Sequence, residues 1–340
     1  MISIECFKGL PLEYESFLVD KYNSFITTCR YIEVYCTSYD INYMLVYNNS
    51  TLIEVLIFGN RGNTSTCFNS LVDIEQNIVS EFIKKIFENY SSIQKIKIDA
   101  SYHNYFLNKS FLFSKSDDYI LNLPLTLDDY YLELGYHTRK NLRNRNVRLL
   151  RDYPTVNFVT KFGVEIEENI IDKIIQLNWD RMKQKGIIPR INNAYKNNIY
   201  KYSQHYGSVT YLEIDKLIVA GCISTKLNKG IFLHVIAYDN NFSKYNVGEL
   251  CVFHLIQTSI EKGISIVHFL WGESELKKRF LAKPFILFSY YIFRAYSIDY
   301  VFSKVNITFS TLLNNFQHSK FSKPIRTSIK LYRKKKWITN

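Results

Sequence analysis

The segment from Phe232 to Lys277 constrains the fold of this chain most, because its patterns alternate in an order typical of α/β domains. An apolar strand pattern ends near Asp239, a polar loop covers 243–248, and a helix pattern runs from Gly248 to Lys262. A second strand pattern covers 265–271 and ends in a turn that closes at Lys277. We expect the helix to cross over between two parallel strands of a mixed sheet.

The loop before this helix has the features of an anion-binding site. Gly248 lets backbone N–H groups approach a ligand closely, and the first turn of a helix presents unpaired N–H groups and partial positive charge. We therefore expect Asn246, Val247 and Gly248 to bind a diphosphate. Glu249 follows directly and would oppose an anion unless its side chain turns aside. An isolated glycine before a helix is more often only a turn residue, so the hypothesis depends on the whole series of elements.

This ordered series resembles the GNAT acyltransferase superfamily, specifically its FemAB-like and CelD-like branch. In that branch a Tyr-Asp strand end, a loop with glycine and a helix lead to a Gly-(Asp/Glu)-x-x-Tyr-Lys turn. The sequence departs from the pattern at His268, where the family often has an acidic residue, and at Leu276, where it has an aromatic one. The resemblance covers residues 160–285, and the segment 127–143 is similar to a basic helix that links tandem GNAT-like halves. The matching residues are Tyr238, Asp239, Gly248, Gly272, Glu273 and Lys277.

The resemblance implies an enzyme that transfers an acyl group from an acyl-coenzyme A (CoA) thioester, its co-substrate, to an amine, with no tightly bound cofactor. The implied acceptor is an amino sugar linked to dTDP or UDP, used in the biosynthesis of cell-surface polysaccharide such as O-antigen or capsule. The amine would attack the thioester directly, so only a modest base is needed and no covalent enzyme intermediate forms. The open edge of the strand would pair with the pantetheine amides. The remaining residues of the implied CoA site are Val235, Ile236, Ala237, Tyr238 and Lys277.

Three side chains are candidates for the catalytic base. Glu273 comes directly after a strand end, where active sites of α/β folds open and where burial can raise a carboxyl pKa, so it ranks first. Asp239 ends the preceding strand. His234 falls in a strand that would line the cleft, but a lone histidine in a strand is more often a packed core residue. A bound water is the remaining alternative, and Trp271 is expected to contact the acceptor substrate.

Positive charge gathers in two segments without acidic residues, 139–151 with six basic residues and 320–340 with eight. Without these 14 of the 43 basic residues, 29 remain against 31 acidic ones, so the two segments carry the positive field. We expect Arg139, Lys140 and Arg143 to bind a phosphate of the acceptor, because guanidinium groups bind phosphate through two donors. The alternative is a solvated basic surface. The second segment is more typical of a solvated or loosely packed chain end.

The length of 340 residues suits two domains. The two halves also show the same order of elements, with strand patterns at 43–47, 51–58 and 93–98 around a helix at 73–88, and strand patterns at 209–214, 217–226, 231–238 and 265–270 around the helix that begins at 248.

We therefore predict two tandem GNAT-like domains with mixed sheets and flanking helices, the first one degenerate. The predicted boundaries are 1–125, a basic linker helix region 126–152, and a C-terminal acyltransferase domain 153–340 that includes the basic tail. In the linker region, Thr126 has the capping-box pattern and Thr138 is expected to cap a second helix. Helices over 167–185 and 193–206 would shape the acceptor pocket.

Several function classes lack support in the sequence. The six cysteines show no CxxC or zinc spacing, and no histidine pair has HExxH spacing, so we predict no metal site and reduced core cysteines of a cytoplasmic protein. No signal peptide is evident. The most apolar stretch, 285–302, is interrupted by Arg294 and Asp299, so no membrane-spanning helix is predicted. No feature indicates an oligomeric state.

Two alternatives to acyl-CoA chemistry stay open. A FemAB-like transferase of peptidoglycan synthesis that uses aminoacyl-tRNA would employ the basic helix, but the charged heptad run of the coiled coil that often marks that group is missing. A non-enzymatic nucleic-acid-binding protein would explain the net charge of +12. No zinc finger or RNA-recognition motif accompanies this charge, so we expect small-molecule substrates and no nucleic-acid partner.

Overall fold

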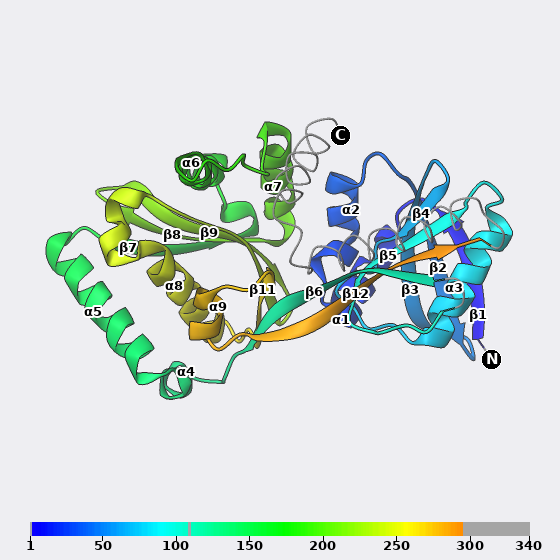
Figure 1. Ribbon diagram of the computed structural model, residues 1–340, viewed down its shortest axis with the longest axis horizontal. Coiled ribbons are helices and arrows are strands. Elements are labelled where there is room, and N and C mark those ends of the chain that lie inside the picture. Colours follow the sequence, from blue (N-terminus) through cyan, green and yellow to red (C-terminus); the bar gives the residue numbers. More distant parts are fainter. Residues whose placement is uncertain (1, 108–109, 295–340) are drawn as a thin grey trace, which may run out of the picture.

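The computed structural model describes residues 2–107 and 110–294, which form one continuous mixed sheet of twelve strands covered by helices (Figure 1). The basic segment 320–340 lies outside the described residues. The strand order is β1-β2-β3-β4-β5-β12-β6-β11-β10-β9-β8-β7. The sequence analysis predicted mixed sheets with flanking helices in two GNAT-like halves, and the structure joins the two halves through this single sheet.

The first half contains the strands β1 (Ile2–Lys8), β2 (Asp40–Asn48), β3 (Thr51–Arg61), β4 (Thr64–Cys67), β5 (Lys95–Ser101) and β6 (Ser110–Asn122). Its helices are α1 (Glu15–Tyr22), α2 (Cys29–Tyr35) and α3 (Gln76–Asn89), with short 3-10 turns η1 (Leu12–Tyr14) and η2 (Phe25–Thr27).

The second half begins with α4 (Leu127–Glu133) and α5 (Tyr136–Asp152) and continues with β7 (Asn157–Phe162), η3 (Gly163–Glu165), α6 (Glu168–Gln184), α7 (Asn193–Tyr206), β8 (Gly207–Ile214), β9 (Leu217–Leu227) and β10 (Gly230–Tyr238). The turn η4 (Asn240–Tyr245), α8 (Val247–Glu261), β11 (Ile266–Trp271), α9 (Glu275–Arg279) and β12 (Lys283–Phe293) complete it.

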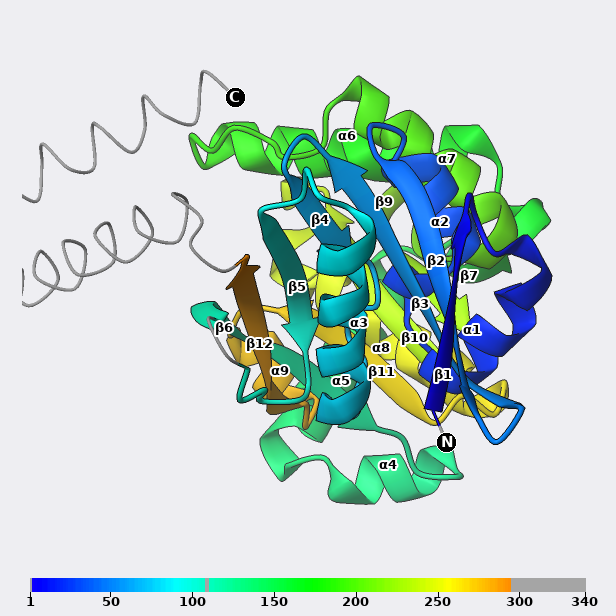
Figure 2. The same ribbon diagram turned by 90° about the vertical axis from the view of Figure 1, so that its right-hand side faces the viewer.

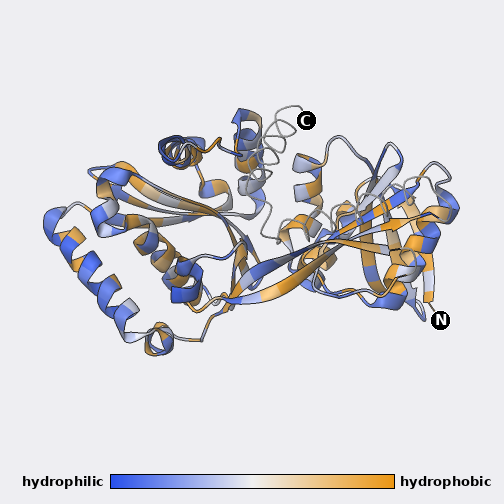
Figure 3. Ribbon diagram, viewed as in Figure 1, coloured by the Kyte–Doolittle hydropathy of each residue, from blue (hydrophilic) through white to orange (hydrophobic). Residues whose placement is uncertain are grey.

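Local sequence patterns explain the regular elements. In α3 the residues at helical spacing, Ile78, Phe82 and Ile86 among them, are buried, and the ring of Phe82 packs 5.6 Å from that of Phe58 in β3. Figure 2 shows α3 in front of this part of the sheet. Asn49 and Ser50 have positive φ angles in the turn between β2 and β3, as a tight hairpin requires. Figure 3 shows apolar residues along the strands, mostly polar residues in α6, and a mixture of polar and apolar residues in α5.

The linker region follows the prediction at one helix and departs from it at the next. Thr126 caps α4, since its side chain accepts a hydrogen bond from the Asp129 N–H. Helix α5 begins at Tyr136, and its N-cap is Gly135, which makes no side-chain cap bond. The predicted cap at Thr138 is therefore wrong, because that residue lies inside the first turn of α5.

Two long strands exchange partners between the halves. Strand β6 of the first half pairs with β11 of the second, and β12 of the second half pairs with both β6 and β5. The sequence did not indicate this exchange, because these strands meet partners far away in the chain.

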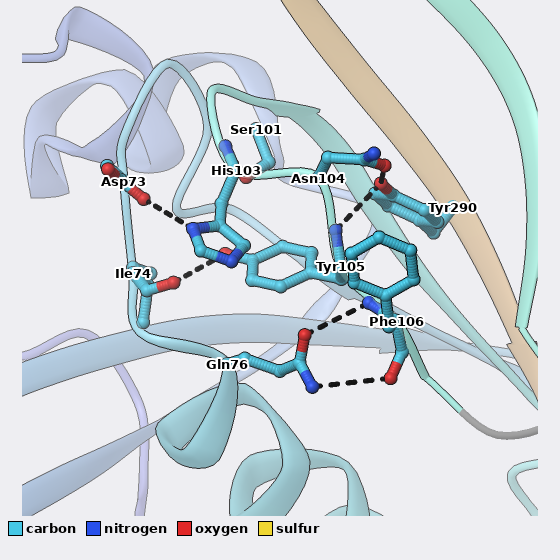
Figure 4. Close-up of polar contacts among 9 residues, drawn as sticks. All are labelled: Asp73, Ile74, Gln76, Ser101, His103, Asn104, Tyr105, Phe106 and Tyr290. Carbon is cyan, nitrogen blue, oxygen red and sulfur yellow. Dashed lines mark hydrogen bonds and ion pairs between the residues drawn. The ribbon is translucent and has the colours of Figure 1, made fainter.

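The hydroxyl group of Tyr290 fastens β12 to the loop that follows β5 (Figure 4). It accepts a hydrogen bond from the Tyr105 N–H at 2.9 Å and donates one to Asn104 Oδ1 at 2.7 Å. The hydroxyl group of Tyr105 then donates to the Ile74 carbonyl at 3.0 Å. This buried network ties the last described strand to the first half.

Replacing Tyr290 by phenylalanine is expected to lower the free energy of unfolding by about 1–3 kcal/mol, because it leaves the buried Tyr105 N–H without its acceptor. Urea unfolding monitored by circular dichroism measures the change. Tyr291→Phe is the matched control, since no hydrogen bond of the Tyr291 hydroxyl is found in the described chain and its ring stacks on Phe113 at 4.2 Å. Equal stability of the two variants would show that the network contributes nothing.

Strands β10 and β11 separate after a short parallel contact. They pair only at Gly230–Ile266, Ile231–Val267 and Phe232–His268. The ladder between β10 and β9 is irregular between Leu233 and Val235, which is the signature of a bulge. Beyond Phe232 the edge of β10 that faces β11 has no strand partner in the described residues, and this opening positions the site.

Candidate active site

A cavity of about 1050 Å³ begins at the opening between β10 and β11. One wall is β10, and the N-terminus of α8 and the segment 269–279 form a second side. Helices α6 and α7 close the cavity together with η2 and α2 of the first half. The cavity is therefore lined by both halves of the chain.

Two backbone N–H groups at the start of α8 have no acceptor in the described chain, and one of them belongs to Gly248, which lines the cavity. The Asn246 N–H already donates to the Ser243 carbonyl at 2.9 Å, and the Glu249 N–H donates to the Asn246 carbonyl at 2.9 Å. Only the N–H groups of Val247 and Gly248 have no hydrogen-bond acceptor in the described chain. The prediction that Asn246 donates its N–H to a diphosphate is therefore corrected, and two donors remain of the predicted three.

Packing alone requires a glycine at position 248, whether or not a ligand binds there. A Cβ atom at this position would lie 2.6 Å from Cδ1 of Tyr238, closer than real contacts allow. Tyr238 lines the cavity, and the Arg181 guanidinium lies 5.0 Å from the centre of its ring. Glycine thus allows α8 to begin directly against the end of β10.

Glu249 is buried and neutralised by two arginines. Its carboxylate binds Arg145 of α5 at 2.6 Å and Arg279 of α9 at 2.9 and 3.1 Å. With its amide oxygen turned toward α5, Asn246 accepts from Nε and Nη2 of Arg145 at 3.0 and 2.9 Å. The side chain of Glu249 has therefore turned into ion pairs, and the cluster of Glu249, Arg145 and Arg279 carries a net positive charge beside the N-terminus of α8. The sequence analysis missed Arg145 and Arg279, because their partner is distant in the chain.

Replacing Glu249 by alanine is expected to lower the free energy of unfolding by about 2–4 kcal/mol, because two guanidinium groups lose the carboxylate that compensates them. Both arginines are partly exposed, so water screens their charges and limits this loss. Thermal and urea unfolding provide the measurement. The exposed pair Arg30–Glu33 supplies a matched control: Glu33→Ala should change stability by less than about 1 kcal/mol, and an equally small change for Glu249→Ala would contradict the buried ion-pair assignment.

His234 stands at the bulge of β10 and is open to the cavity. Its Nε2 atom lies 2.8 Å from Thr225 Oγ1, and its ring contacts that of Phe25 with 4.7 Å between ring centres. Surrounding protein atoms desolvate the imidazole and lower the pKa of His234 to about 4. The side chain is thus a neutral imidazole at pH 7 that faces the cavity and can accept a proton, with the low basicity that a pKa near 4 gives it.

The two carboxylates predicted as bases do not line this cavity. Glu273 is exposed and forms an ion pair with Lys278, which lowers the pKa of the Glu273 carboxyl. The Asp239 side chain accepts the N–H of Asn241 at 2.9 Å and caps η4. Of the three predicted base candidates only His234 lines the cavity, which favours it over Glu273, and the ranking itself stays a prediction.

Lys277 holds the end of β11. Its ammonium group donates to the carbonyls of Leu270, Trp271 and Gly272 at 2.8, 2.9 and 2.6 Å. Burial lowers the pKa of Lys277 to about 8, against the opposing effect of Asp118. All three donors of the ammonium group are thus occupied. Lys277 thus has a structural role, and its predicted contact with CoA stays a prediction; Lys277 and Trp271, the predicted acceptor contact, both line the cavity.

The side of the cavity away from α8 is aromatic and cationic. Tyr31 and Tyr35 of α2 contact Tyr195 and Tyr202 of α7, with ring centres 5.4–6.0 Å apart, and Phe25 contacts Tyr31 at 5.4 Å. Three basic side chains from α6 and the loop after it also line this region: Arg181, Lys185 and Arg190. The sequence analysis predicted that α6 and α7 shape this pocket, but it missed the contribution of α2 from the first half.

The predicted phosphate ligands on α5 lie elsewhere. Arg139, Lys140 and Arg143 line a separate groove of about 930 Å³ between α5 and α8. Arg139 donates to the carbonyls of Tyr131 and Leu132 at 3.0 and 3.1 Å and so covers the end of α4. The structure does not bring these residues together with the cavity beside His234.

His268 belongs to a buried cluster between the halves. Its Nδ1 atom lies 2.6 Å from Asp118 Oδ2, which also accepts the Tyr102 hydroxyl at 2.8 Å. The imidazole stacks on Phe232 with 4.3 Å between ring centres. His268 is thus paired with a carboxylate from β6. The GNAT branch that the sequence resembles often has an acidic residue at the position of His268.

Among residues 2–107 and 110–294, no group of three or more His, Cys, Asp or Glu side chains is arranged to hold a metal ion. All six cysteines are free thiols, and all but Cys6 are buried. No helix in the described part of the chain has the length and apolar character needed to cross a membrane.

Residues 137–278 match a family described as acetyltransferase (GNAT) domain. A comparison with curated protein sequences finds no match. Among solved structures, FemX has a TM-score of 0.61 at 10% identity, covering 85% of this chain and 97% of FemX. L-PGS from Bacillus licheniformis has a TM-score of 0.55 at 12% identity, covering 86% of this chain and 95% of that chain.

A conserved protein of unknown function from Bacteroides thetaiotaomicron VPI-5482 is also similar, with a TM-score of 0.55 at 13% identity over 86% of this chain and 99% of that one. At sequence identities of 10–13% the similarity shows a shared fold only. It extends over both halves of the described sheet, and the predicted fold class is thereby confirmed.

Proposed function

We propose that this chain, whose residues 137–278 match the family described as acetyltransferase (GNAT) domain, transfers an acyl group from acyl-CoA to the amine of a nucleotide-linked amino sugar. The observation that carries the proposal is one cavity that joins three features. These are the open edge of β10, the unpaired N–H groups at the start of α8, and the neutral imidazole of His234. A CoA thioester needs the strand edge and the N–H groups, and the acceptor amine needs a base.

The donor would extend along β10. Its pantetheine amides would pair with the strand edge beyond Phe232, which has no partner in β11 within the described residues. The diphosphate would accept the N–H groups of Val247 and Gly248, and the net charge of Arg145, Arg279 and Glu249 favours an anion there. Both contacts would bring the thioester near the bulge at His234.

The reaction then needs one proton transfer by the protein. The amine nitrogen attacks the thioester carbon, and a backbone N–H of the β10 edge stabilises the oxygen that becomes negative. His234 takes the proton from the attacking nitrogen, the C–S bond breaks, and CoA leaves as a thiolate that is protonated by water. Thr225 holds the imidazole through its hydroxyl group.

The acceptor would occupy the aromatic and cationic side of the cavity. Tyrosine rings such as Tyr35 and Tyr195 suit a nucleobase or a sugar face, and Lys185 and Arg190 suit a diphosphate. The buried Arg181 Nε–H, which has no partner in the described chain, is a further donor for an acceptor oxygen. A nucleotide-linked amino sugar meets all three requirements, and its place would be cytoplasmic biosynthesis of a cell-surface polysaccharide.

Incubation of the protein with a panel of acyl-CoA thioesters and UDP- or dTDP-linked amino sugars tests this proposal. We expect a product with the mass of the acylated sugar nucleotide and release of one equivalent of free CoA thiol. Thiol release without any acylated sugar would reject the acceptor but keep the donor. No consumption of any acyl-CoA would reject both.

An aminoacyl-tRNA-dependent transfer is the second candidate, and the similarity to FemX over most of both chains favours it. This donor carries no CoA diphosphate, but it is a polyanion whose binding weakens steeply as salt increases. Transfer of a radiolabelled amino acid from charged tRNA, with no turnover of acyl-CoA, would select this candidate.

A further inference from the structure

One face of α5 carries an alternation of cations and apolar side chains that is open to solvent and borders the groove between α5 and α8. Tyr136, Lys140, Arg143, Val147 and Leu150 follow one another at intervals of four and three residues, which places them on one side of a helix. Leu142 and Leu149 lie on the opposite side and are buried. Figure 1 shows α4 and α5 at one end of the molecule.

The apolar members of this stripe are open to solvent. Tyr136, Val147 and Leu150 are between 45% and 62% exposed. Leu132 of α4 is 74% exposed, and it lies next to the first turn of α5 because its carbonyl accepts from Arg139. Single exposed apolar residues are ordinary, whereas a row of them on one helix face marks an interaction surface.

The cations of the stripe are not neutralised by the protein. No ion pair of Lys140 or Arg143 is found in the described chain, although the Lys140 ammonium lies 5.9 Å from the Tyr136 ring. Two other arginines of α5 already have partners within the protein. Arg145 binds Glu249, and Arg148 binds the Lys244 carbonyl. Four members of the stripe, Tyr136, Lys140, Arg143 and Val147, also line the groove whose wall is formed by Leu250 and Phe253 of α8.

We propose that this stripe, with Leu132 beside it, docks the protein on the surface of an anionic membrane. A helix that mixes lysine or arginine with exposed leucine, valine and tyrosine binds lipid interfaces through charge attraction and apolar burial together. RNA would use the cations and the tyrosine but would leave Leu132, Val147 and Leu150 in water. The apolar members therefore favour lipid over RNA. The proposal is independent of the acyl transfer, since the stripe lies outside the cavity beside His234.

Vesicle sedimentation with the full chain tests this surface. We expect binding to vesicles of phosphatidylcholine with about a quarter phosphatidylglycerol, and at least tenfold weaker binding to phosphatidylcholine alone. Lys140→Glu/Arg143→Glu should weaken binding to the anionic vesicles by at least tenfold, because each cation near an anionic surface contributes roughly fivefold. The control Lys8→Glu/Lys229→Glu makes the same change in net charge at exposed positions away from α5 and should bind like the unaltered protein.

A second variant separates lipid from RNA. Leu132→Gln/Val147→Gln/Leu150→Gln keeps every charge, and we expect it to weaken binding to the anionic vesicles severalfold while the circular dichroism spectrum stays unchanged. Equal binding of this variant and the unaltered protein, together with salt-dependent binding of single-stranded RNA that Lys140→Glu/Arg143→Glu abolishes, would assign the surface to RNA and overturn the proposal. Equal binding to neutral and anionic vesicles would overturn it as well.

Discussion

Replacing His234 by alanine is expected to lower kcat by about 10²–10⁴-fold at pH 7, the range by which a positioned general base accelerates proton transfer. The pKa of His234 lies near 4, below the ordinary value of about 6.5, so the base form is present at neutral pH and is lost only as the pH falls toward 4. The variant should recover activity as the pH rises, because the acceptor amine then loses its proton to solvent. Initial rates with saturating donor and acceptor from pH 5 to 9 measure both effects.

Glu273→Gln is the matched control for this experiment. That carboxylate is exposed and paired with Lys278, so we expect kcat to stay within about twofold across the same pH range. The CoA affinity of His234→Ala should also be unchanged, which separates loss of the base from loss of the donor. If His234→Ala keeps full activity while Glu273→Gln loses it, the order of base candidates taken from the sequence is right and the one taken from the structure is wrong.

Replacing Gly248 by aspartate is expected to weaken CoA binding by at least a hundredfold. A carboxylate about 5 Å from one phosphate charge costs on the order of 3 kcal/mol at an effective dielectric constant of about 20. The new Cβ atom would also meet the Tyr238 ring at 2.6 Å, so the variant should unfold more easily, by about 1–3 kcal/mol. Isothermal titration with CoA and urea unfolding measure the two effects separately.

Two controls accompany Gly248→Asp. Gly135→Asp is the same substitution at a position where a Cβ atom meets nothing within 4 Å, and it should leave CoA affinity unchanged. Gly248→Ala keeps the contact with Tyr238 but adds no charge, so its CoA affinity should lie between those of the unaltered protein and Gly248→Asp. A folded Gly248→Asp variant that binds CoA with full affinity would place the diphosphate elsewhere.

The second half of the fold was predictable because its patterns are local. The strand patterns at 209–214, 217–226 and 231–238 match β8, β9 and β10, and the helix expected from 248 matches α8. The exchange of β6 and β12 between the halves was not predictable, since hydrophobic periodicity gives no information about which distant strand becomes a partner. The domain boundaries at 125 and 152 remain a prediction, because sequence periodicity does not tell which distant strands pair across them.

The site was predictable only in part. Gly248 was found because a glycine before a helix has a local signature, and His234 because it lies in the strand that lines the cavity. Its rank below Glu273 rested on position in the sequence alone, because the exposure of Glu273 and its ion pair with Lys278 are properties of the folded chain. The pairing of Arg145 and Arg279 with Glu249 joins residues 104 and 30 positions apart, and no sequence pattern connects them.

The most direct test of the proposed donor site is a crystal structure with CoA. We predict pantetheine along β10 between Leu233 and Tyr238, the diphosphate at the N–H groups of Val247 and Gly248, and the thiol within about 5 Å of His234, close enough for an acceptor nitrogen between them. The opposite result is CoA bound away from the opening between β10 and β11, or no bound CoA at millimolar concentration. The first result would contradict the proposed donor site, and the second would contradict an acyl-CoA-dependent transferase.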